Sequence, residues 1–78
     1  MNDIWIIDGI ESFTDNEVSI FNRWGDLVRE FKGYDNADKV WKGEGVSGRE
    51  MPAGTYFYSI ETGVKEKKKK KGWVYLDP

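Results

Sequence analysis

The sequence predicts an all-β protein, folded as an antiparallel β-sandwich of about six to seven short strands. Apolar residues alternate with polar ones or form short runs, and no segment shows the 3.6-residue period of a helix. Turn residues separate these segments at short, even intervals, which is typical of a sandwich. The chain has 78 residues, no cysteine and 15% aromatic residues, so its stability depends on burying large rings. We expect residues 1–78 to form a single domain.

The first half of the chain predicts one separate strand and one hairpin. Residues 4–7 are an apolar run closed by an Asp-Gly pair, which indicates a strand followed by a turn. Residues 17–22 are rich in β-branched and aromatic side chains, and residues 27–31 have the same character. Between them Gly25 is expected to take a positive φ in a tight turn. Residues 17–32 are therefore expected to form a β-hairpin.

The middle of the chain is less regular. Residues 32–38 are polar and rich in turn formers, so a loop is expected. Residues 39–42 form at most a short strand, and residues 43–50 contain three glycines and are expected to connect two elements. Pro52 and Gly54 mark a tight bend, because proline fixes φ and glycine tolerates conformations that other residues resist.

The two strongest strand signals lie near the end of the chain, where residues 54–61 are expected to pair with residues 70–76. Because neighbouring strand positions face opposite sides, Trp73 or Val74 is expected inside, alongside alternate residues of 56–60. Six short strands without helices favour an immunoglobulin-like sandwich. An up-and-down barrel is the alternative, but six short strands would close it poorly.

The residue types argue against catalysis, so we expect no enzyme, no cofactor and no metal site. The absence of cysteine and histidine removes thiolate ligands, cysteine nucleophiles and the commonest general base. Fourteen acids are present, but no pair is marked by spacing or by an apolar neighbourhood. Acidic segments at residues 15–17 and 35–38 lack the ligand spacing of a calcium loop, and turns explain them better. No signal peptide and no membrane-spanning segment are visible.

Residues 65–71 are a run of six lysines and one glutamate, a local charge of +5. The whole chain has a net charge of −2, so the remainder sums to −7. Such a run could bind nucleic acid, anionic lipopolysaccharide or an acidic partner. A solvated hairpin whose lysines block edge-to-edge strand pairing is the favoured interpretation. Aromatic residues lie on one side of the run only, so no nucleic-acid binding is expected.

Four motifs together resemble a known family. They are DGIE at residues 8–11, IFNRWG at 20–25, MPAGTYFY at 51–58 and KGWVYL at 71–76. In this order and spacing they are similar to the type B C-terminal sorting domain of the type IX secretion system of Bacteroidota, also called the gliding-motility-associated C-terminal domain. The family's Trp-Asp-Gly turn reads Trp41-Lys42-Gly43 here, so position 42 lacks a carboxylate able to accept backbone hydrogen bonds.

The resemblance implies an immunoglobulin-like domain at the C-terminus of a long secreted protein. Such a domain is recognised by outer-membrane proteins of the secretion machinery, which export its N-terminal cargo protein and leave it secreted or attached to the cell surface. Two alternatives stay open from the sequence. One is a cell-surface adhesion or carbohydrate-binding sandwich, and the other is a structural or redesigned variant with no current partner.

Recognition of so small a domain is expected to use exposed loop residues, because the strands are committed to the core. Arg and Trp are enriched at binding hot spots, and both occur in the first hairpin. The candidate recognition residues are Asn22, Arg23, Trp24, Leu76 and Asp77. Gly25, Pro52 and Gly54 are expected to act as structural turn residues.

The four tryptophans are expected to belong mainly to the core, since a small domain without cysteine depends most on burying area. They are Trp5, Trp24, Trp41 and Trp73. Trp24 is at the same time a recognition candidate.

Overall fold

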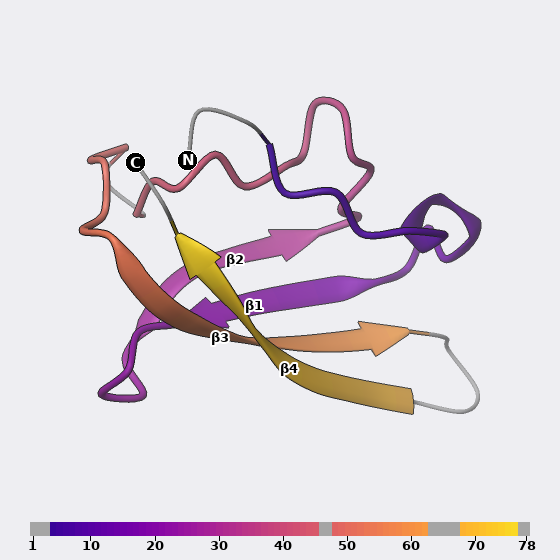
Figure 1. The fold of residues 1–78 in the computed structure, drawn as a ribbon. Coiled ribbons are helices and arrows are strands. Elements are labelled where there is room, and N and C mark those ends of the chain that lie inside the picture. Colours follow the sequence, from indigo (N-terminus) through magenta and orange to yellow (C-terminus); the bar gives the residue numbers. More distant parts are fainter. Residues whose placement is uncertain (1–3, 46–47, 63–67, 77–78) are drawn as a thin grey trace.

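The computed structural model describes residues 4–45, 48–62 and 68–76. One four-stranded antiparallel sheet forms the centre, and irregular segments run over one of its faces (Figure 1). The strands, in the order β2-β1-β3-β4 across the sheet, are β1 (Glu17–Phe21), β2 (Leu27–Lys32), β3 (Gly54–Thr62) and β4 (Lys68–Leu76). The longest helix in these described ranges is a three-residue 3-10 helix, η1 (Ile10–Ser12).

Two hairpins build the sheet, as the sequence predicts. Strands β1 and β2 pair antiparallel, with a register shift between Ile20 and Phe21. Strands β3 and β4 pair from Gly54 opposite Leu76 to Thr62 opposite Lys68. Strand β1 also pairs antiparallel with β3, which joins the two hairpins into one sheet. The predicted pairing of residues 54–61 with 70–76 is therefore confirmed.

The core lies between the sheet and an irregular layer, formed by residues 4–16 and 33–45, on what we call the inner face of the sheet. Alternation places Val18 and Ile20 of β1 and Tyr56 and Ile60 of β3 on this face, and all four are buried. Val74 of β4 packs against them, which confirms the expectation that Trp73 or Val74 faces inward. The irregular layer contributes four further buried hydrophobic side chains, Ile10, Tyr34, Val40 and Trp41.

The expected sandwich of six to seven strands is not confirmed, because the described residues form four strands in one open sheet. Segments 4–7 and 39–42, expected as strands, run through the irregular layer without a ladder. A single backbone bond joins them, from the Trp5 N–H to the Trp41 carbonyl oxygen at 3.0 Å.

A side chain takes the place of the missing strand partner. Asn36 accepts the Ile7 N–H at its Oδ1 and donates its Nδ2 to the Ile7 carbonyl oxygen, both at 2.8 Å. Asn36 itself has a positive φ of 66°, a conformation that does not continue a strand. Because the amide satisfies both polar groups of Ile7, no neighbouring strand is needed there.

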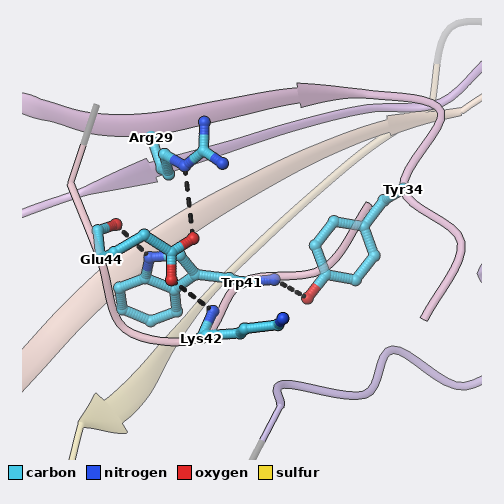
Figure 2. Close-up of polar contacts among 5 residues, drawn as sticks. All are labelled: Arg29, Tyr34, Trp41, Lys42 and Glu44. Atoms are coloured by element: carbon cyan, nitrogen blue, oxygen red, sulfur yellow. Dashed lines mark hydrogen bonds and ion pairs between the residues drawn. The ribbon is translucent and has the colours of Figure 1, made fainter. Parts of the chain in front are cut away.

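The irregular layer is held by a polar network around two aromatic residues (Figure 2). The Tyr34 hydroxyl accepts the Trp41 N–H at 2.8 Å. It also donates to the Trp5 carbonyl oxygen at 2.6 Å. The Trp41 indole N–H donates to the Glu44 carbonyl oxygen at 2.7 Å. Burial is the largest effect on the Tyr34 phenol and raises its pKa to about 12. This network satisfies the polar atoms of large buried side chains.

Glu44 supplies the carboxylate that position 42 lacks. Its Oε2 accepts the Lys42 N–H at 3.0 Å, and its Oε1 lies 3.5 Å from the Arg29 Nε on β2 (Figure 2). The turn after Trp41 therefore has a carboxylate acceptor from a residue two positions later, and the same carboxylate ties the layer to the sheet.

The expectation of core tryptophans is half right. Trp41 is fully buried and Trp5 is partly buried, with its ring 6.4 Å from the Trp41 ring. Trp24 is 73% exposed and Trp73 is 67% exposed, so the expectation is wrong for these two. Trp24 lies at the tip of a hairpin, and Trp73 points to the face of the sheet that the irregular layer leaves uncovered.

Candidate functional site

The tip of the β1–β2 hairpin is a tight turn organised by one side chain. The Asn22 Oδ1 accepts the Trp24 N–H at 3.0 Å and the Asp26 N–H at 2.9 Å. The Asn22 carbonyl oxygen accepts the Gly25 N–H at 3.0 Å. Gly25 has a φ of 86°, which confirms the expected positive value and disfavours any residue with a β-carbon. The turn thus keeps Arg23 and Trp24 at the exposed tip of the hairpin.

Arg23 and Trp24 form one composite surface. The Arg23 guanidinium carbon lies 4.5 Å from the centre of the Trp24 ring, which is a cation–π distance. Both side chains are exposed. Together they present a flat apolar ring covered by a positive charge, a combination suited to a protein partner with an acidic or aromatic side chain.

A bend before β3 lies next to this tip. Gly54 has a φ of 148°, and the Tyr56 hydroxyl donates to the Pro52 carbonyl oxygen at 2.5 Å. A shallow hollow is lined by residues 22–24 of the hairpin and residues 51–56 of the bend. The motifs IFNRWG and MPAGTYFY, about thirty residues apart in the sequence, therefore meet at one end of the sheet.

The last two recognition candidates have different outcomes. Leu76 is 2% exposed, so the expectation that it lies on an exposed chain end is wrong. Its side chain packs against Gly43 of the irregular layer, where an added β-carbon would lie 2.9 Å from Leu76 Cδ1. Leu76 pairs with Gly54, so β4 ends beside the bend. Asp77 lies outside the described residues.

The acidic loop at residues 35–38 acts as a turn. The Asp35 Oδ1 accepts the Ala37 N–H at 2.8 Å and the Lys39 N–H at 2.9 Å. These backbone hydrogen bonds hold the pKa of the Asp35 carboxyl below its ordinary value. Within the ranges described, no group of three or more His, Cys, Asp and Glu side chains could hold a metal ion.

The lysine run is described only in part. The side chains of Lys69, Lys70 and Lys71 on β4 are exposed, as expected, whereas residues 65–67 lie outside the described ranges. No helix in the part of the chain that the structure describes is long and apolar enough to cross a membrane.

The sequence interpretation missed an apolar row on the outer face of the sheet, the face without the irregular layer. Phe21, Phe57 and Trp73 occupy neighbouring positions on β1, β3 and β4. Phe57 is 45% exposed and Phe21 is partly exposed. One signal was available, because consecutive aromatic residues in a strand face opposite sides and a core on one face cannot bury them all.

Comparisons with known proteins identify the family of this chain. No curated protein and no solved structure matches it. Residues 1–76 match the family described as "CHU_C Type IX secretion signal domain", which is the family that the four motifs resemble. The chain belongs to the family of type IX secretion signal domains.

Proposed function

We propose that the secretion machinery recognises this domain at the tip of the β1–β2 hairpin, through Arg23 and Trp24 held in place by Asn22. Membership of the family makes the domain a sorting signal, which directs export of a larger protein to the outside or the surface of the cell. The proposal adds which residues are recognised. The proposed partners are outer-membrane proteins of the secretion machinery in a bacterium of the Bacteroidota. The proposed cargo is a protein N-terminal to the domain.

The observation that carries this proposal is an exposed tryptophan on an ordered turn. Trp24 is 73% exposed, although burying it would remove a large apolar area from water. Two hydrogen bonds from backbone N–H groups to Asn22 hold the turn that exposes it. Because Arg23 already lies over the Trp24 ring, this contact reduces the conformational entropy that the pair has to lose on binding.

The domain is proposed to act without catalysis, by being bound. The sequence contains neither histidine, the commonest general base, nor cysteine. We also infer that residues 1–78 form one domain, in which the irregular layer occupies the place of the second sheet of an immunoglobulin-like sandwich. The close approach of segments 4–7 and 39–42 supports this comparison.

Export of a reporter tests the proposal. The domain is fused to the C-terminus of a reporter that carries a signal peptide, in a Bacteroidota host with an intact type IX system. We expect the reporter outside the outer membrane with the wild-type domain, and a severalfold loss of export with Arg23→Ala. Arg49→Ala is the matched control, because Arg49 is also exposed but lies outside the hairpin. Equal export of the two variants would overturn the assignment of Arg23.

Carbohydrate binding is the second candidate, because the exposed aromatic residues of the outer face have the character of a sugar-stacking platform. Affinity electrophoresis in neutral polysaccharide gels measures it directly. Retardation of the wild-type domain that is lost in Trp73→Ala would support an adhesive role. Unretarded migration would leave sorting as the function of the domain.

A further inference from the structure

The outer face of the sheet carries a row of large apolar side chains across all four strands. Strand register places Leu27 of β2 opposite Phe21 of β1, Phe21 opposite Phe57 of β3, and Phe57 opposite Trp73 of β4. We call these four residues the outer row. Leu27 is 50% exposed and Trp73 is 67% exposed. An exposed apolar patch of this kind marks an interaction surface.

Positive charge surrounds the groove beside the outer row. Phe21 and Phe57 line this groove together with the hairpin tip, and so do Arg23, Lys69 and Lys71. No carboxylate of the described residues lines it. The chain as a whole has more acids than bases, and this local excess combines two lysines of the run at residues 65–71 with Arg23 of the hairpin tip.

We propose that the outer row and its cationic groove bind a short, extended acidic segment of a protein partner, with an aromatic or aliphatic side chain between acidic ones. The apolar side chain would contact Phe21 and Phe57, and the carboxylates would lie near Arg23 and Lys71. This deepens the proposed function, on which it rests for the partner's place in the secretion machinery. The binding chemistry itself is independent of that function.

The length of the outer row and the charge of the groove favour an acidic peptide segment over other ligands. Three strand spacings of about 4.8 Å make the row about 14 Å long, the length of about four extended residues. A second copy docked face to face would bring Arg23, Lys69 and Lys71 of each copy against those of the other, which is unfavourable. A neutral glycan would offer these cations no opposite charge. An acidic segment pairs them and covers the row at the same time.

Two-dimensional NMR of the ¹⁵N-labelled domain tests the proposal, because the four tryptophans report on both faces. The probe is the acetylated, amidated peptide Asp-Phe-Asp-Leu-Asp. We expect the indole N–H signals of Trp24 and Trp73 to shift on titration, and those of Trp5 and Trp41, in the irregular layer on the opposite side of the sheet, to stay in place. The peptide Lys-Phe-Lys-Leu-Lys should shift none of the four signals. Raising the salt concentration should weaken binding of the acidic peptide.

Two phenylalanines with similar exposure give a matched pair of variants. Phe57 of the outer row is 45% exposed, and Phe13 after η1 is 48% exposed. Phe57→Ser should weaken peptide binding about tenfold, whereas Phe13→Ser should leave it within about twofold. If Phe57→Ser fails to fold, Lys71→Glu with Arg49→Glu as its control tests the same groove by charge.

The competing occupants give distinct results. Equal shifts with the lysine peptide, or binding unchanged in both Phe57→Ser and Lys71→Glu, would overturn the proposal. Shifts of Trp73 with domain concentration alone would assign the face to a second copy instead. Shifts of Trp24 and Trp73 with phosphatidylglycerol vesicles, without shifts from the acidic peptide, would assign it to a membrane.

The reporter assay separates this inference from the proposed function. A wild-type reporter that is exported, combined with a domain that does not bind the acidic peptide, would refute the inference alone. A wild-type reporter that stays inside the outer membrane, combined with peptide binding as described, would refute the proposed function alone.

Discussion

The two faces of the sheet are both rich in aromatic residues, yet they serve different ends. The inner face buries Tyr56 of β3 against Trp41 of the irregular layer, with ring centres 5.5 Å apart. The outer face leaves Phe57 and Trp73 exposed on neighbouring strands. The same residue types therefore stabilise the fold on one face and are available for binding on the other. What distinguishes the faces is the layer that covers only one of them.

Removing one tryptophan from each side of the sheet should give the largest difference in the free energy of unfolding. Trp41→Ala should lower the free energy of unfolding by about 3–5 kcal/mol, because a fully buried ring and its hydrogen bond to Glu44 are lost. The free energy of unfolding of a domain of this size is itself only a few kcal/mol, so the variant should be largely unfolded. Trp73→Ala should cost less than about 1 kcal/mol. Urea unfolding followed by circular dichroism measures both, and similar losses would contradict the distinction between the faces.

Alkaline pH should destabilise the fold through the buried phenol of Tyr34. Burial raises the pKa of Tyr34 to about 12 from an ordinary value of 10.0, so between these pH values the folded chain holds a proton that the unfolded chain releases. The stabilisation is fully present below pH 10 and is lost as the pH rises toward 12. The loss should amount to about 2–3 kcal/mol, and burial also raises the pKa of Tyr56, which acts in the same direction.

Urea midpoints between pH 9 and pH 11.5 test this pH dependence. Tyr34→Phe is the control, because it lacks the titrating phenol and should show a flatter profile from a lower starting stability. A wild-type midpoint that stays constant over this range would show that Tyr34 is not buried as described.

A glycine of β4 that faces the core and a glycine of the exposed hairpin tip sharpen the comparison at a smaller scale. A β-carbon at Gly72 of β4 would collide with the Tyr58 ring on the inner face, so Gly72→Ala should cost about 1–3 kcal/mol. A β-carbon at Gly25 would meet nothing within 4 Å, and Gly25→Ala should cost about 1 kcal/mol through its positive φ alone. Tyr58→Leu should relieve part of the Gly72→Ala loss and none of the Gly25→Ala loss. Equal effects of Tyr58→Leu in both backgrounds would refute the steric account.

Local signals in the sequence predicted the two hairpins. Long-range contacts determined which face of the sheet is covered and where segment 4–7 lies. Alternation identified Val18 and Ile20 as residues of one face, and Gly25 marked its turn by residue type alone. Alternation does not say which face of a sheet is covered, so Trp73 was placed wrongly. Segment 4–7 has the Asn36 amide as a hydrogen-bond partner at Ile7 instead of a neighbouring strand, and no local pattern reveals this contact between residues twenty-nine positions apart.

The candidate site was predictable to the same limited extent. The hairpin tip could be chosen from the sequence, because turn residues flank an Arg-Trp pair. The cationic groove could not, since strand register alone brings Lys71 of β4 to the position opposite Ser59, next to Phe57. Leu76 shows the reverse error, because a residue near the end of a strand need not be exposed when a loop packs over it.

The central claim is that the surface recognised for export is separate from the core that holds the fold. The most direct measurement compares Trp24→Ala with the wild-type domain in the reporter assay and in urea unfolding of the same proteins. We predict an unfolding free energy within about 1 kcal/mol of wild type, together with export reduced severalfold. Wild-type export by a stably folded Trp24→Ala domain would contradict the claim.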